Sequence, residues 1–139
     1  MDSLNIDSNI HNKFEGYPDA AKVKLLTIRA AIFDVAAEES LGDIAESLKW
    51  GEPSYLSTMG SAIRIDWKHK SPNTISVYVN CKTNLIDTFK EIYSNTLIFV
   101  GNREIVFQIT DELPMSELKA CISMALRYHQ IKHLPLLGA

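Results

Sequence analysis

The spacing of apolar residues changes along this chain, from a helical period before position 40 to a period of two after position 43. Residues 18–37 carry two apolar stripes at helical spacing: Val23, Leu26, Ala30, Phe33 and Ala37, and Leu25, Ile28, Ile32 and Val35. Two stripes on one helix predict burial on most of its sides, so we expect this helix at the centre of the core. Pro18 suits its first turn. A shorter helix is predicted over residues 7–15.

The alternating pattern that follows predicts strands. Strands are expected at 44–50, 63–67, 75–79, 97–100 and 103–109, and helices at 84–93 and from Pro114 onward. Gly51 and Pro53 are expected to break the first strand, and Gly101 with Asn102 favours a two-residue hairpin turn. The order of elements predicts an α+β fold, with a mainly antiparallel sheet of about five strands and helices packed on one face.

The length of 139 residues fits one domain, with no repeat or linker to divide it. We expect an N-terminal segment over residues 1–17, a single domain over 18–134 and a C-terminal tail over 135–139. Hydrophobic residues make up 46% and charged residues 22%, a composition that favours a globular chain over a disordered one.

Charge and apolar runs exclude two classes of partner. The net charge is −3, and no basic stripe is present that would indicate nucleic-acid binding. No apolar run of 18 or more residues is present, so a membrane partner is not expected. The first seven residues lack the pattern of a signal peptide. Two cysteines forty positions apart, Cys81 and Cys121, favour a reduced, cytoplasmic protein. Exposed sheet edges permit a dimer, but no residue demands one, and the oligomeric state stays open.

The segment Leu-Lys-Trp-Gly-Glu-Pro-Ser-Tyr at 48–55 resembles the YdhG-like family, the proteins that carry domain of unknown function 1801. The family pattern is filled by Glu46, Leu48, Trp50, Gly51, Pro53 and Tyr55. Residues 103–107, Leu113-Pro114, Leu118 and Ile122 resemble its closing strand and last helix, so the resemblance spans residues 18–131.

This resemblance implies a sheet with helices packed on it, similar in outline to frataxin. It implies little about activity, because most members have none assigned, although one bacterial branch has been proposed to act as an intracellular iron chaperone. The chain departs from the family at Glu52, where members usually carry methionine or another apolar residue.

Four residues around this motif form the candidate ligand site. Alternation places Glu46 on the same face as Leu48 and Trp50, where a charge is costly unless it is paired. We expect Glu46 in a pocket lined by Trp50 and Tyr55, with Glu52 as a second carboxylate beside the turn. The alternatives are that Glu46 reaches water or bonds to the turn, and that the aromatic residues are simply core.

Acidic residues gather around the end of the first long helix, at Asp34, Glu38, Glu39, Asp43 and Glu46. Oxygen ligands suit Fe(II), so Asp34, Glu38, Glu39 and Asp43 form a candidate metal surface. Contacts between exposed charges are worth only about 1 kcal/mol in water, so a metal would bind weakly there. A merely solvated face is the alternative.

No nucleophile with a nearby base is visible in the sequence, so catalysis is not indicated. The leading hypothesis is a non-catalytic, cytoplasmic binding or interaction domain whose partner is a small molecule or a protein. No resident cofactor is expected. The alternative, implied by the resemblance, is low-affinity iron handling through the acidic surface, and an enzyme comes third.

Overall fold

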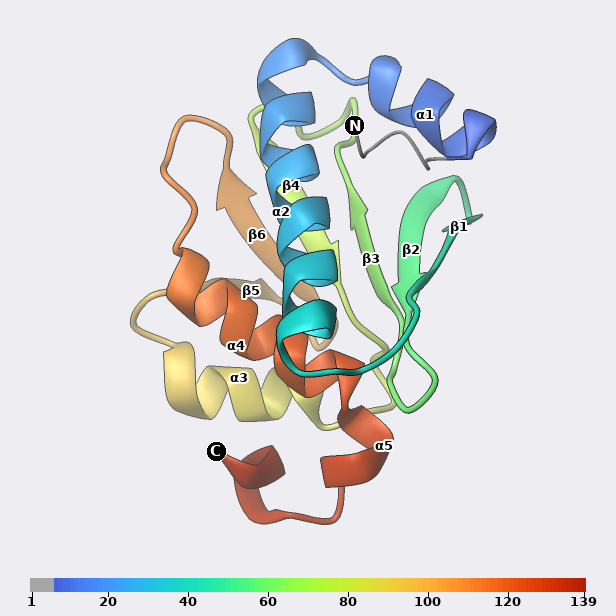
Figure 1. Cartoon of the computed structure of the whole chain (residues 1–139). Helices are drawn as coiled ribbons and strands as arrows, with labels where there is room; N and C mark the ends of the chain where they lie inside the picture. The colour runs from blue at the N-terminus through green and yellow to red at the C-terminus, as the bar shows by residue number, and fades with distance from the viewer. Residues whose placement is uncertain (1–6) are drawn as a thin grey trace.

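Six strands form one antiparallel sheet, in the order β1-β2-β3-β4-β6-β5, in the computed structural model, which describes residues 7–139 (Figure 1). The strands are β1 Ala45–Lys49, β2 Glu52–Leu56, β3 Ile63–Asp66, β4 Thr74–Tyr78, β5 Ile98–Val100 and β6 Glu104–Gln108. The helices are α1 Ser8–Glu15, α2 Asp19–Glu38, α3 Leu85–Tyr93, α4 Met115–Leu126, α5 Tyr128–Ile131 and the 3-10 helix η2 Pro135–Gly138. The predicted α+β class and antiparallel sheet are confirmed. The first six residues of the predicted N-terminal segment lie outside the described residues.

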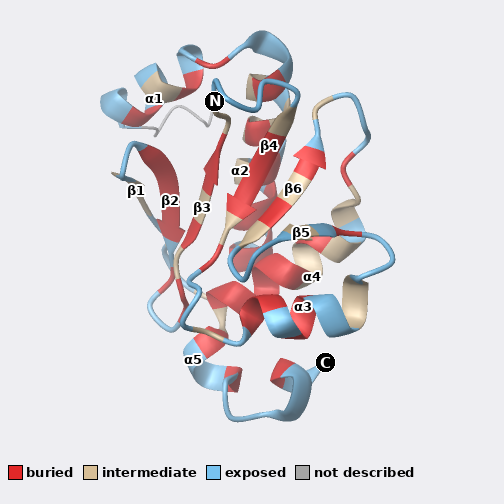
Figure 2. Cartoon of the chain, turned by 180° about the vertical axis from the view of Figure 1, so that it is seen from behind, coloured by how far each residue is buried: buried red, intermediate tan, exposed pale blue. Residues whose placement is uncertain are grey.

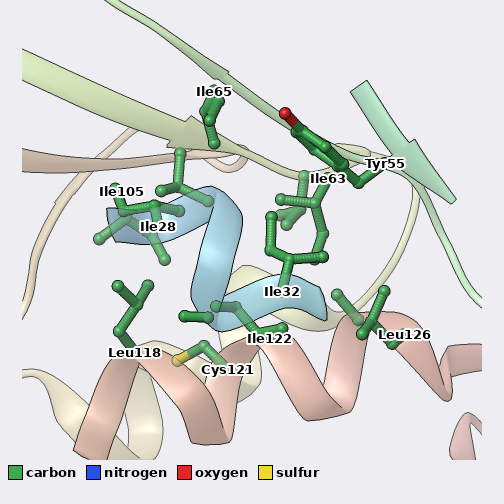
Figure 3. Packing of buried hydrophobic residues seen from close by; sticks show 14 of the residues in the cluster. Ile28, Ile32, Tyr55, Ile63, Ile65, Ile105, Leu118, Cys121, Ile122 and Leu126 are labelled. Carbon is green, nitrogen blue, oxygen red and sulfur yellow. The ribbon is translucent and has the colours of Figure 1, made fainter. Parts of the chain in front are cut away.

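Helix α2 packs on the sheet through one of its two predicted stripes. Ile28 and Ile32 are fully buried, and Figure 3 shows them between the strands and α4. The second stripe is largely uncovered, since Val23 is 61% exposed and Ala30 is also exposed. The expectation of burial on most sides is therefore wrong, because the sheet and α4 cover one side of α2 and leave the other to solvent.

The strand that the sequence pattern missed is β2. Gly51 and Pro53 were expected to break the first strand, and no strand was predicted after them. Pro53 in fact lies inside β2 and pairs with Leu48 of β1. Lys49 and Glu52 close the hairpin. The next pair in an antiparallel ladder is not hydrogen bonded, so Pro53 needs no N–H toward β1. The β2–β3 ladder begins only at Ser54, which frees Pro53 on that side too. The expected number of about five strands is corrected to six.

The turn between β5 and β6 is one residue longer than predicted. Val100 pairs with Glu104, so the loop holds three residues, 101–103. The extra residue, Arg103, contacts the residue that follows β4. Its carbonyl accepts a hydrogen bond of 2.8 Å from the N–H of Val79.

Both ends of the described chain join the core of residues 18–134. The predicted short helix is present as α1, and its Ile10 and Phe14 are buried at 3% and 2% exposure. The Asp7 carboxylate caps α1 by accepting a hydrogen bond of 2.9 Å from the N–H of Asn9. At the other end, Leu137 of η2 is 1% exposed.

Helices and core lie on one side of the sheet. In Figure 2, β3, β4 and β6 lie in front of α2, so the viewer sees the face of the sheet that is turned away from α2. We refer to the face turned away from α2 as the open face. Within residues 7–139, none of the helices combines the length and the apolar character needed to cross a bilayer.

Candidate functional site

The open face of the sheet carries polar side chains that are buried although α2, α3 and α4 leave it uncovered. Neighbours in a strand alternate between faces, so Ile63 and Ile65 point into the core and Arg64 and Asp66 point to the open face. Asp66 is only 5% exposed and Glu52, on β2, only 9%. Carboxylates at this depth cost free energy unless they are paired.

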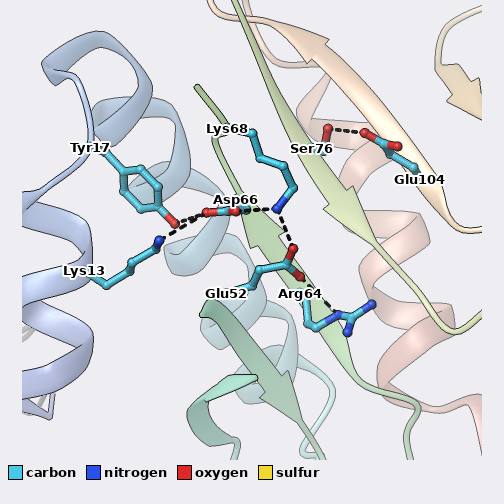
Figure 4. A network of polar contacts seen from close by, with 8 residues as sticks. All are labelled: Lys13, Tyr17, Glu52, Arg64, Asp66, Lys68, Ser76 and Glu104. Atoms are coloured by element: carbon cyan, nitrogen blue, oxygen red, sulfur yellow. Dashed lines mark hydrogen bonds and ion pairs between the residues drawn. The ribbon is translucent and has the colours of Figure 1, made fainter. Parts of the chain in front are cut away.

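A network of charged groups pairs these two carboxylates (Figure 4). The Nζ of Lys68 donates to Oε2 of Glu52 and to Oδ2 of Asp66, each over 2.8 Å. The Nε of Arg64 lies 3.4 Å from Oε1 of Glu52. From the other side, the hydroxyl of Tyr17 donates to Oδ1 of Asp66 over 2.5 Å. The network ties the loop after α1 to β3 and β2, and it compensates both buried charges.

The environment fixes the protonation of the two donors. Burial opposes the charge of Lys68, but the hydrogen bonds to Asp66 and Glu52 outweigh it and raise the pKa of Lys68 above its ordinary value. Burial raises the pKa of Tyr17, and its hydrogen bond to Asp66 raises it further. Lys68 therefore stays cationic and Tyr17 stays a neutral donor through the neutral pH range.

Trp50 stands at the tip of the β1–β2 hairpin in an unusual backbone conformation. Its φ is +55° and that of Gly51 is +76°. Two positive φ angles are typical of the type I′ turn, which prefers asparagine followed by glycine. A left-handed conformation costs a residue with a side chain about 1–2 kcal/mol. The Trp50 side chain recovers none of this by burial, because it is 90% exposed.

Two adjoining grooves lie beside Trp50 on the open face. The first, of about 510 Å³, contains the charged network and extends to Ser76 and Glu104, and we call it the polar groove. The second, of about 610 Å³, has a largely apolar lining that includes Leu56 and Ala62, and we call it the apolar groove. Three residues line both grooves: Trp50, Arg64 and Arg103.

The four residues of the predicted ligand site are divided between two sides of the sheet. Trp50 and Glu52 both line the polar groove. Glu46 and Tyr55 pair across β1 and β2 and lie on the core side. Alternation mispredicted the position of Trp50 because that residue belongs to the turn, where the strand pattern no longer applies.

Glu46 is held by Arg29 of α2. The Nε of Arg29 donates to Oε2 of Glu46 over 2.6 Å, and Nη2 donates to Oε1 over 2.9 Å. The guanidinium also lies over the ring of Phe33, 4.7 Å from its centroid. These residues line a separate groove of about 610 Å³ between α1, α2 and β1. Their charged groups already satisfy each other there.

Tyr55 is a core residue. It is fully buried, and its ring meets that of Phe33 edge to face with centroids 6.0 Å apart. Its hydroxyl has no hydrogen-bond partner among residues 7–139. Burial, followed by the charge of Glu46, raises the pKa of Tyr55. Tyr55 therefore supports the site from behind and does not face a ligand in the grooves.

The acidic residues at the end of α2 point to different partners. Oε2 of Glu38 lies 3.5 Å from the Nζ of Lys119. Glu39 accepts a hydrogen bond of 2.7 Å from the hydroxyl of Ser123 and pairs with Arg127 over 3.2 Å. The remaining two predicted ligands, Asp34 and Asp43, are exposed. Across residues 7–139, no three His, Cys, Asp or Glu side chains gather in a way that could hold a metal ion.

Sequence reasoning found Trp50 and Glu52 but missed the other residues that build the open face. Arg64, Asp66 and Lys68 alternate with Ile63 and Ile65, which is a visible signal that three charges share one face of a strand. The partners of these charges on other elements have no such signal. No family model, curated protein or solved structure matches this chain. The resemblance to the YdhG-like family therefore stays a prediction.

Proposed function

We propose that this protein is a non-catalytic module that binds a small molecule in the two grooves of the open face, with Trp50 as the side chain on which the ligand stacks. The observation that carries the proposal is the conformation of Trp50. A bulky aromatic residue occupies a left-handed turn position and remains 90% exposed. Such backbone outliers cluster at functional sites. If this turn position served the fold alone, asparagine or glycine would adopt its conformation at lower cost.

The surroundings of Trp50 support binding rather than folding as its role. The rings of exposed tryptophans offer a large flat surface for planar ligands. The grooves on both sides of it have the volume of small-molecule sites, about 510 and 610 Å³. Lys68 pairs with both Glu52 and Asp66 in the polar groove. These ion pairs restrain the three side chains before a ligand binds, so binding loses little side-chain entropy.

A cytoplasmic location is part of this proposal. Cys81 and Cys121 form no disulfide in the structure, and unpaired thiols are typical of reducing compartments. The iron-handling alternative has no comparable support in the described residues, since Glu38 and Glu39 pair with cationic residues of α4 and its end.

The proposal is tested by calorimetric titration with two planar probes, 2-naphthoate and its neutral analogue 2-naphthamide. We expect at least one probe to bind with 1:1 stoichiometry to the wild-type protein and to lose measurable binding to Trp50→Ala. Trp67→Phe is the matched control, because Trp67 lies outside both grooves. Binding of neither probe, or equal binding to Trp50→Ala, would overturn the proposal.

A further inference from the structure

We infer that the ligand of these grooves is an amphipathic anion, with an apolar body in the apolar groove and a carboxylate or phosphate head at Arg64 and Arg103. This inference rests on the proposed function and adds the chemical class of the ligand. It follows from how charges are distributed between the two grooves, although the chain as a whole has a net charge of −3.

All charged side chains of the apolar groove are cationic. Lys49, Arg64 and Arg103 line it, and none of its described lining residues is acidic. The same groove has a mainly apolar wall, which includes Leu56 and Ala62. Arg64 lies 3.4 Å from Glu52, so the positive charge without a carboxylate partner among residues 7–139 is that of Lys49 and Arg103. Apolar surface beside this charge matches a molecule that is apolar along its body and negative at one end.

The carboxylates of the open face are confined to the polar groove and already have partners. Lys68 bonds to Glu52 and Asp66, and the hydroxyl of Ser76 donates to Glu104 over 2.6 Å. The charges of Glu52 and Asp66 are thus already compensated by Lys68 and Arg64, which lowers their attraction for a cationic ligand.

Arg103 is the cation with the most freedom to meet a ligand. It is exposed and lines both grooves. None of the ion pairs among residues 7–139 involves its guanidinium. A planar guanidinium presents a fork of N–H donors that matches two oxygens of a carboxylate or phosphate. Trp50 lines the same two grooves, so a ring stacked on it leaves the head group within the cationic part of the site.

The experiment compares affinities of charged and neutral probes by calorimetry at two salt concentrations. We expect 2-naphthoate to bind at least about fivefold more tightly than 2-naphthamide, the factor given by about 1 kcal/mol of charge interaction. Added salt should weaken only the anion. Arg103→Gln should reduce the preference for the anion, whereas Lys132→Gln, an exposed lysine outside both grooves, should leave it unchanged.

Two further probes separate the possible head groups and test the apolar body. Tighter binding of 2-naphthyl phosphate than of 2-naphthoate assigns a phosphate head, and the reverse assigns a carboxylate. Inorganic phosphate alone should bind more weakly than 2-naphthyl phosphate, and equal binding would overturn the inferred apolar body.

The remaining outcomes separate the inference from the proposed function. If 2-naphthamide binds as tightly as 2-naphthoate and binding still requires Trp50, the proposed function stands and the anionic class is overturned. If no probe binds, both are overturned.

Discussion

The guanidinium of Arg29 forms a bidentate ion pair with the carboxylate of Glu46 on the core side of β1, with hydrogen bonds of 2.6 and 2.9 Å. From sequence, Glu46 was the leading ligand-binding residue. Its place in a two-point ion pair between α2 and the edge strand assigns it a structural role instead. A substitution there should change stability and leave the grooves of the open face intact.

Glu46→Gln should therefore lower the free energy of unfolding by about 2 kcal/mol, because it removes the negative charge and one of the two acceptor oxygens that compensate the largely buried Arg29. Urea unfolding monitored by circular dichroism measures this change. Binding of 2-naphthoate should keep its wild-type affinity. Unchanged stability together with weakened binding would contradict this assignment of Glu46.

Trp50→Asn should stabilise the fold by about 1 kcal/mol, since asparagine adopts the left-handed turn conformation more easily than tryptophan. The exposed indole contributes no burial that the variant would lose. The same variant should lose binding of the probes. Thermal unfolding and calorimetry on one preparation measure both effects. A destabilised variant would show that Trp50 supports the fold.

Tyr17→Phe should change how stability depends on alkaline pH. Burial first, and the hydrogen bond to Asp66 second, raise the pKa of Tyr17 above its ordinary 10.0. The unfolded chain releases this proton near pH 10 while the folded chain retains it. The contribution of Tyr17 is thus complete below about pH 10 and declines as pH rises further, by about 1.4 kcal/mol per pH unit.

Urea unfolding of the wild type and Tyr17→Phe at pH values from 8 to about 11 tests this dependence. The wild-type curve should fall more steeply than that of the variant at the alkaline end. Tyr55, whose pKa is also raised, is present in both proteins and cancels in the comparison. Parallel curves would contradict the described environment of Tyr17.

The two thiols should differ sharply in reactivity. Burial raises the pKa of Cys121 to about 12, so its reactive thiolate is nearly absent at neutral pH. Cys81 is exposed and lines the apolar groove. Titration with a chromogenic disulfide should label one thiol in the native protein and two in denaturant. Rapid labelling of both in the native state would contradict the packing of α4.

Local patterns predicted the elements whose partners lie nearby in the sequence. The β3–β4 hairpin and the bounds of α2 followed from the period of their apolar residues. The strand β2 did not, because Pro53 is tolerated only through its pairing geometry, which the sequence does not display.

The candidate site was predicted only in part for a related reason. The motif drew attention to Trp50 and Glu52, but the contacts that build the open face join distant segments. Tyr17 and Asp66 are 49 positions apart, and Glu52 and Lys68 are 16 apart. No spacing rule links residues at such separations. The division between Glu46 and Trp50 also depends on where the β1–β2 turn begins, and a shift of one residue there exchanges the faces.

The two indole N–H signals in a nitrogen-15 correlation spectrum provide the most direct measurement of the proposed working surface. The indole of Trp67 serves as an internal reference, because its N–H donates to the carbonyl of Pro72 over 2.9 Å, outside both grooves. During titration with 2-naphthoate, the Trp50 signal should shift and saturate while the Trp67 signal stays in place. A Trp50 signal that does not move at saturating probe would contradict the proposal that the open face binds small molecules.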